Sequence, residues 1–181
     1  YWPVVVSDVT NHGGATTLQL KQPLRVDVRM EWKPMVRRTT MVEEVGLEHL
    51  RIDFKDLEHT SHFASNSYNA VSSTGVVNGW IRDVAIRDSD LPIWLDHTKH
   101  ITMTGIRILP RVVGTSGGHH GVTMYRTADS ILENFSIDTE YFHDITIYGH
   151  SNGNVVRQGR GKDLCIDFHT RLPHENLISC V

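Results

Sequence analysis

The residues most suited to chemistry are concentrated in three similar stretches of the second half of the chain. Each stretch is a short run of alternating polar and apolar residues, which is typical of a β-strand with one buried face. Histidine, lysine or aspartate stands at or near the start of each run. The three stretches are residues 118–125, 142–148 and 162–169. Histidine, lysine and tyrosine can exchange protons with a substrate, so stacking of the three runs would build one site from distant residues.

Stacking of these stretches in register predicts columns of side chains on their outer face. The predicted columns are His120, His143 and Lys162; then Tyr125, Tyr148 and Asp167; then Arg126, followed by positions near His150 and His169. The same columns are also what the plain outer face of a repeat protein would present.

The strands that must position these columns recur along most of the chain in two interleaved series. One series covers residues 45–52, 79–86, 99–108, 130–137, 153–159 and 176–181. The other covers residues 70–72, 93–96, 122–124, 145–147 and 164–166. No amphipathic helical window separates them, which argues against a βαβ fold. The pattern predicts an all-β, single-stranded parallel β-helix, a β-solenoid whose apolar residues stack on their equivalents one turn away.

The final isoleucines of the first series indicate the length of one turn. Ile52, Ile86, Ile108 and Ile137 are separated by steps of 34, 22 and 29 residues. The shortest step corresponds to a bare turn, and the longer steps carry loops.

Residues 1–44 precede the regular pattern and are expected to form an entry region or first irregular turns. Short β-type runs occur at residues 2–6, 16–20 and 24–30, separated by Gly13-Gly14 and by prolines. Residues 45–181 form the predicted solenoid. Because the chain lacks an initiator Met and stops within an expected strand, we interpret it as a segment of a longer protein.

The pattern from Val45 to Val181 resembles the right-handed parallel β-helix of the pectate lyase-like superfamily, whose members are mostly secreted enzymes that cleave acidic polysaccharides. Ile93-Trp94-Leu95-Asp96-His97 resembles the Trp-x-Asp-His signature of pectate lyases. Arg171-Leu172-Pro173 resembles the start of their Arg-x-Pro-x-x-Arg element, although Asn176 stands at the second Arg position. The resemblance implies a right-handed coil, an extracellular location, an arginine base and calcium-binding aspartates.

A second resemblance is to polygalacturonases, through Gly118-His119-His120-Gly121 and Arg160-Gly161-Lys162. Those hydrolases also need a pair of carboxylates arranged as acid and base across the glycosidic bond. Asp88, Asp90 and Asp96 lie upstream but include no adjacent pair.

The residue inventory itself fits elimination from an acidic glycan better than hydrolysis. Cationic side chains can neutralise carboxylate or sulfate groups, and β-elimination needs a base and an acid that His, Lys, Arg and Tyr can provide. The candidate catalytic residues are His120, His143, Tyr125, Arg126, His169 and Lys162. The candidate substrate-binding residues are His119, Tyr148, His150, Arg157, Arg160 and Arg171. A polysaccharide lyase is the leading interpretation; a non-catalytic structural, adhesive or glycan-binding solenoid and a polygalacturonase-like hydrolase remain alternatives.

Three carboxylates lie nearest the histidines in the sequence: Asp144, Asp163 and Asp167. They could orient imidazoles, bind Ca²⁺ or act as acid and base. Zinc held by His119, His120 and His143 is disfavoured, because adjacent strand residues point to opposite faces.

Composition sets the remaining expectations. The net charge of -3, from 18 basic and 21 acidic residues without long runs, favours neither nucleic acid nor an anionic membrane as a partner. The two cysteines, Cys165 and Cys180, allow one disulfide without determining it. Asn134-Phe135-Ser136 matches an N-glycosylation acceptor, consistent with secretion. The expected partner is a polysaccharide, and self-association stays open.

Overall fold

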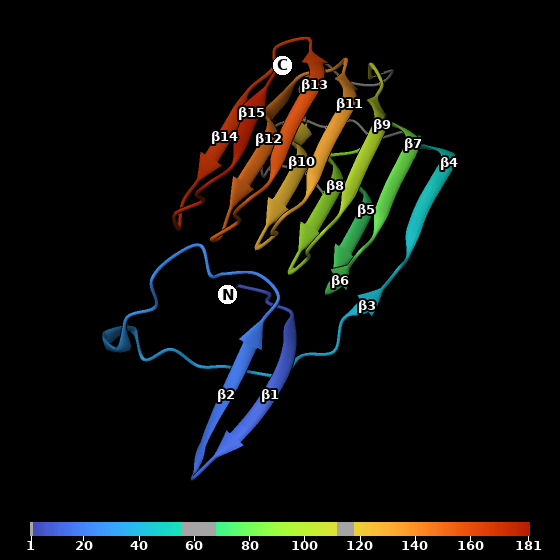
Figure 1. Ribbon diagram of the computed structural model, residues 1–181. Helices are drawn as coiled ribbons and strands as arrows, with labels where there is room; N and C mark the ends of the chain where they lie inside the picture. Colours follow the sequence, from blue (N-terminus) through green and yellow to red (C-terminus); the bar gives the residue numbers. More distant parts are fainter. Residues whose placement is uncertain (1, 56–67, 112–117) are drawn as a thin grey trace.

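The protein is all-β, with parallel strands in stacked sheets, as seen in a computed structural model that describes residues 2–55, 68–111 and 118–181 (Figure 1). The strands of the six-stranded sheet are β4 (Gly46–Asp53), β7 (Trp80–Arg87), β9 (Thr102–Ile108), β11 (Ile131–Ile137), β13 (Val155–Gly161) and β15 (Leu177–Ser179). The strands of the five-stranded sheet are β5 (Asn69–Thr74), β8 (Leu91–Asp96), β10 (Gly118–Tyr125), β12 (Tyr141–Tyr148) and β14 (Ile166–His169).

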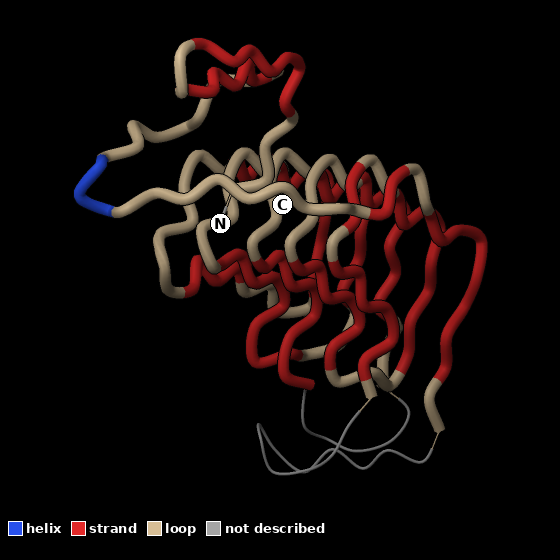
Figure 2. Tube along the Cα trace, turned by 90° about the horizontal axis from the view of Figure 1, so that it is seen from below, coloured by secondary structure: helices blue, strands red, loops and turns tan. Residues whose placement is uncertain are grey.

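From β7 onward, consecutive strands of the chain alternate between the two sheets. Each return to a sheet adds a strand next to the previous one, so that successive passes of the chain lie side by side (Figure 2). A third, much shorter ladder begins with β3 (Val42–Glu43) against β6 (Val76–Val77) and continues as single bridges. The predicted interleaving of two strand series is confirmed, and the arrangement is compatible with a solenoid.

The register matches the isoleucine steps read from the sequence. Ile52 pairs with Ile86, Ile86 with Ile108, and Ile108 with Ile137. Equivalent apolar residues therefore stack from one turn to the next, which lets each turn bury its side chains against its neighbours.

The core lies between the two sheets and consists of stacked aliphatic columns. Leu95, Met124 and Ile147 form one column of the five-stranded sheet and are completely buried. Their neighbours Val122 and Ile145 are also buried in this core. Thr123 and Thr146, which alternate with them, face away from the core but are themselves covered by other side chains and buried. Because inward and outward residues alternate, a buried core on one face fixes which side chains reach the other face.

Left-handed backbone conformations bend the six-stranded sheet along one column. Asp83, Gly105, Asn134 and Gln158 have φ values of 51°, 68°, 51° and 53°, and each interrupts the ladder between two paired segments. Gly, Asn and Asp tolerate this region better than other residues, which suits Gly105, Asn134 and Asp83 to the bend; Gln158 adopts it without this advantage.

Buried amides join neighbouring turns beside the core. Asn154 accepts a hydrogen bond from the Ser130 backbone amide and donates one to the Thr127 carbonyl, while Asn176 accepts from the Asn154 backbone amide. These bonds satisfy main-chain groups that the turns would otherwise leave unpaired in the interior.

The N-terminal residues form a hairpin outside the stacked sheets. Strands β1 (Val6–His12) and β2 (Ala15–Leu20) are antiparallel and turn at Gly13-Gly14, as the glycine pair predicted. The strands predicted at residues 2–6 and 24–30 are wrong: β1 begins only at Val6, and residues 24–30 lie outside β-strands. A 3-10 turn, η1 (Met30–Trp32), follows. Pro3 lies just before β1 and Pro23 directly precedes residues 24–30, and neither proline can donate a backbone hydrogen bond to a sheet.

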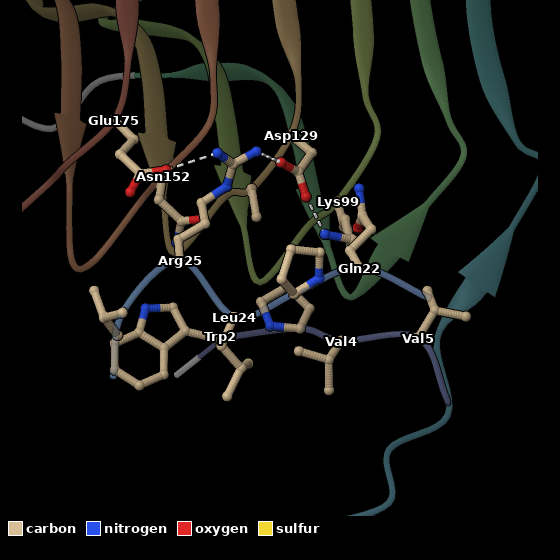
Figure 3. Close-up of a pocket in the computed structure, with 14 residues that line it drawn as sticks. Trp2, Val4, Val5, Gln22, Leu24, Arg25, Lys99, Asp129, Asn152 and Glu175 are labelled. Carbon is tan, nitrogen blue, oxygen red and sulfur yellow. Dashed lines mark hydrogen bonds and ion pairs between the residues drawn. The ribbon is translucent and has the colours of Figure 1, made fainter. Parts of the chain in front are cut away.

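Arg25 attaches the N-terminal segment to the turns of the stacked sheets (Figure 3). Its guanidinium contacts Asp129 and lies 2.8 Å from Glu175, and Lys99 contacts Asp129 from another turn. A cavity of about 340 Å³ lies beneath the segment, lined partly by Trp2 and Leu24.

No helix long and apolar enough to cross a membrane occurs among the described residues.

Candidate functional site

The outer face of the five-stranded sheet carries the densest group of chemically useful side chains. Strand register places Tyr125, Tyr148 and His169 in one outward column. The adjacent outward column contains Trp94, Thr123, Thr146 and Asp167. These positions are fixed by the core, because the residues between them point inward.

Aromatic and imidazole rings form a continuous ring surface across β8, β10, β12 and β14, defined here as Trp94, Tyr125, Tyr148, His169, His143 and His120. The Tyr125 and Tyr148 rings stack with centroids 4.3 Å apart, and the Trp94 ring lies about 6 Å from both, at 6.0 and 6.1 Å. The His169 ring is 6.0 Å from Tyr148 and 6.2 Å from His143. The result is one extended surface built from separate turns.

A cationic edge borders the tyrosines. The Arg126 guanidinium carbon lies 4.2 Å from the centre of the Tyr125 ring, a cation–π contact. Arg126 Nη1 donates to His97 Nε2 at 2.8 Å, and His97 Nδ1 lies 2.5 Å from Asp96 Oδ1. Because arginine can only donate, His97 presents Nε2 as the acceptor and carries its proton on Nδ1. His97, itself in contact with Asp96, thus holds the Arg126 guanidinium over the ring surface.

Imidazoles and one carboxylate converge at the other part of the ring surface. The His120 and His143 rings are 5.3 Å apart, and His120 Nδ1 shares a hydrogen bond of 2.6 Å with Thr146 Oγ1. Asp167 Oδ2 lies 3.7 Å from His143 Nε2 and 2.9 Å from His169 Nδ1. His169 is half-exposed, so this group opens to solvent.

Burial raises the pKa of two groups at the site, Tyr148 and Asp144. Burial raises the pKa of Tyr148 to about 12, and the nearby Tyr125 and Asp96 add to this, whereas the charges of Arg126 and Arg171 act in the opposite direction. Burial also raises the pKa of Asp144 to about 6, opposed by the Cys165 amide that donates to its Oδ2. Both shifts favour the neutral form of the group, and the phenol of Tyr148 is neutral at neutral pH.

Two of the three predicted columns are partly confirmed. His120 pairs with His143, and Tyr125 pairs with Tyr148, as expected from the sequence. The predicted third residue of the tyrosine column is wrong: His169, and not Asp167, pairs with Tyr148. Asp167 pairs with Thr146 instead. The correct register nevertheless keeps Asp167 on the outer face beside the predicted histidines.

Three predicted cations lie away from the ring surface. Arg157 and Arg160 belong to β13 of the six-stranded sheet, where Arg157 binds Glu133 and Arg160 approaches Asp138. Lys162 follows β13 and pairs with Glu140 at 2.7 Å, so its expected place above His143 is wrong. The outer face of the six-stranded sheet is a separate, charged surface.

The remaining predicted residues border the site. His119 lies beside His120 with ring centroids 4.0 Å apart, so the expectation that this pair points to opposite faces is wrong. The main-chain amide of His119 donates to Asp90 Oδ1. His150 and Arg171 occupy successive turns joined by a backbone hydrogen bond, and the His150 ring faces Trp2 at 6.1 Å.

The carboxylates proposed for calcium do not converge. Asp144 is buried and bonded to the Cys165 amide, Asp163 is exposed, and Asp167 faces two imidazoles. Among the described residues, the one group of three donors within 4.8 Å of one another is His143, Asp167 and His169, which is not the oxygen-rich set that Ca²⁺ prefers. Both Cys165 and Cys180 are exposed free thiols, so no disulfide links them.

The candidate set from the sequence omitted four contributors. Three of them occurred in a noted motif but were not assigned to the site: Trp94, Asp96 and His97. The fourth, Thr146, was not considered. The sequence did contain an indication that Trp94 belongs to the site, because it lies in the second strand series. The strands of that series form one sheet, so their outward residues share one face.

Comparisons of the chain with protein-family models, with curated proteins and with solved structures find no match. The class of protein is thus described by its own structure: it is an all-β, parallel-stranded protein with an outer face rich in aromatic and imidazole side chains.

Proposed function

We propose that this protein is a right-handed parallel β-helix of the pectate lyase-like type, acts outside the cell, and cleaves an acidic polysaccharide by β-elimination on its ring surface. The observation that carries the proposal is the continuity of the ring surface over four neighbouring strands. A sugar chain has apolar ring faces and polar edges, and aromatic side chains with polar groups beside them match both features.

The charge at the edge of the ring surface supports an acidic substrate. Arg126 is held over Tyr125 by its contact with His97, and the charge of Arg171 also reaches Tyr148. Guanidinium groups can bind a uronate carboxylate through two parallel hydrogen bonds. A bound uronate would thereby have its negative charge offset, which favours removal of the proton α to the carboxylate.

Elimination requires one base and one proton donor. The base removes the proton at C-5, the C4–O bond breaks, a C4–C5 double bond forms, and the leaving oxygen takes a proton. His120 is the candidate base, since its ring is oriented by Thr146 and lies at the ring surface. Tyr148 is the candidate donor, because its phenol lies on the ring surface between Tyr125 and His169 and carries its proton at neutral pH.

The separation of Asp96 and Asp167 argues against hydrolysis by this pair of carboxylates. Asp96 and Asp167 belong to β8 and β14, which are separated by β10 and β12. With strands roughly 4.8 Å apart, these carboxylates are about 14 Å from one another along the sheet. Glycosidases hold their two carboxyl groups about 5 to 9.5 Å apart, so this pair does not suit the hydrolase alternative.

The proposal is tested by incubating the chain with uronic-acid glycans such as polygalacturonate, alginate, hyaluronan and chondroitin sulfate. The expected result is the ultraviolet absorbance of an unsaturated product, reduced about 100-fold or more by His120→Ala and unchanged by Arg157→Ala on the other sheet. Binding of a glycan without any product would favour the non-catalytic glycan-binding alternative. Neither binding nor product with any of these glycans would overturn the proposal.

A further inference from the structure

The three donor groups that converge on the ring surface have the composition of a transition-metal site. His143 and His169 supply imidazole nitrogens and Asp167 supplies a carboxylate oxygen, and their ligand atoms all lie within 4.8 Å of one another. Two histidines and one carboxylate, with further positions open, are a recurrent ligand set for Zn²⁺ and for Fe²⁺. The softness of imidazole nitrogen favours these ions over Ca²⁺ and Mg²⁺.

We propose that His143, Asp167 and His169 bind a divalent transition-metal ion with the preference of a zinc site. The carboxylate stands between the two imidazoles: Asp167 Oδ2 is 3.7 Å from His143 Nε2 and 2.9 Å from His169 Nδ1. Ligand atoms of a tetrahedral zinc site are about 3.3 Å apart, given bonds of about 2.0 Å. Small rotations of the two imidazoles bring the set to that spacing.

The backbone holds the three ligands before any ion binds. His143 lies on β12, and Asp167 and His169 are alternate residues of β14 that pair with Thr146 and Tyr148. Alternate strand residues point to the same face, so both β14 ligands reach the outer surface. A site on paired strands needs little reordering, which leaves more of the interaction energy for binding.

Neighbouring groups orient one ligand. Cys165 Sγ lies 3.9 Å from His143 Nδ1, the nitrogen that does not face Asp167. The Cys165 main-chain amide in turn donates to Asp144 Oδ2 at 2.7 Å. Contacts on the far nitrogen of a metal-binding histidine fix which nitrogen is presented to the ion. Here they present Nε2 toward Asp167.

Exposure leaves room for further ligands on the ion. The side chains of His143 and Asp167 are 21% exposed and that of His169 is 50% exposed. Water or a substrate oxygen can complete the coordination from the solvent side. If the proposed glycan lyase is correct, the ion would lie next to His120 and Tyr148 and would offset the charge of a uronate carboxylate; metal binding itself does not depend on that activity.

The test is a titration of the metal-free chain with Zn²⁺, followed by calorimetry, and with Co²⁺, followed by its visible absorption. We expect one equivalent of Zn²⁺ per chain and a raised melting temperature on binding. Asp167→Asn and His169→Gln should each weaken Zn²⁺ binding at least tenfold. His12→Gln, in the exposed N-terminal hairpin, is the control for coordination by surface histidines and should bind as the parent does.

Circular dichroism of each variant shows whether it folds, and the substitutions lie on the outer face, where the core is not disturbed. Zinc binding that survives in the folded Asp167→Asn and His169→Gln variants would overturn the proposal, as would the absence of binding by the parent chain. Stronger binding of Ca²⁺ than of Zn²⁺ would overturn the assigned metal class. Loss of binding in Cys165→Ser, with binding retained in Asp167→Asn, would also contradict the proposed ligand set.

Discussion

The rings of Tyr125 and Tyr148 stack with centroids 4.3 Å apart and an angle of 17° between their planes. The two residues occupy the same register position on β10 and β12, so the stacking repeats the pairing of the strands. Beneath them, Met124 and Ile147 form the equivalent pair in the core. One backbone register thus builds both the buried column and the half-buried aromatic pair on the outer face.

Replacing Tyr148 by Leu should weaken glycan binding about 3- to 10-fold, because the variant keeps apolar bulk but loses the stacked aromatic face. Affinity electrophoresis or calorimetry would measure the change, with whichever uronic-acid glycan of the test panel the parent chain binds. Trp32→Leu is a matched control, since Trp32 is an exposed aromatic residue in η1, outside the five-stranded sheet. Equal losses in the two variants would show that binding does not use the ring surface.

Replacing Asn154 by Ala should lower the free energy of unfolding by about 1 to 3 kcal/mol, because the Ser130 amide and the Thr127 carbonyl lose buried hydrogen-bond partners. Urea denaturation followed by circular dichroism would measure the change. Asn69→Ala, at the exposed start of β5, should change stability by less than about 0.5 kcal/mol. A similar effect of both substitutions would contradict the structural role of the buried amide.

Replacing Gly159 by Ala should destabilise the protein by about 1 to 3 kcal/mol through overpacking. An added Cβ would lie 2.0 Å from Cε1 of the buried Phe135 ring, whose strand β11 pairs with β13. Combining Gly159→Ala with Phe135→Leu should reduce the penalty relative to the sum of the single changes. Strict additivity in urea denaturation would indicate that the glycine is not required by the phenylalanine ring.

Acid should weaken the attachment of the N-terminal segment. Burial raises the pKa of Asp129, but the hydrogen bonds and charges of Lys99 and Arg25 outweigh it and hold the pKa below its usual value. A lowered carboxyl pKa in the folded state contributes stability above the unfolded pKa of about 4, and that contribution is lost as the pH falls through the folded pKa. Stability should therefore decline below about pH 4.

The comparison that isolates Asp129 is the difference in free energy of unfolding between the parent and Asp129→Asn. At pH 7 the variant should be less stable, because Lys99, whose side chain is only 6% exposed, loses its carboxylate partner. The difference should shrink as the pH falls below about 4. A difference that stays constant from pH 7 to pH 3 would contradict this interpretation.

The sequence by itself determined the alternation of two strand series and the pairing of their strongest positions. The alignment of four isoleucines was possible because each run ends in the same apolar residue, which marks one register position in every turn. These isoleucines are Ile52, Ile86, Ile108 and Ile137. The pairs His120–His143 and Tyr125–Tyr148 followed in the same way from similar neighbouring residues.

Tertiary structure alone decided where β13 ends and how β14 aligns. Lys162 was placed with the histidines, but β13 continues to Gly161 and leaves Lys162 beyond the six-stranded sheet. Asp167 was assigned to the column of Tyr148, which His169 occupies. A shift of two residues preserves the alternation of inward and outward side chains, so periodicity cannot distinguish these registers. The packing of Ile166 beside Ile145 selects one of them, and that selection brings His143, Asp167 and His169 together.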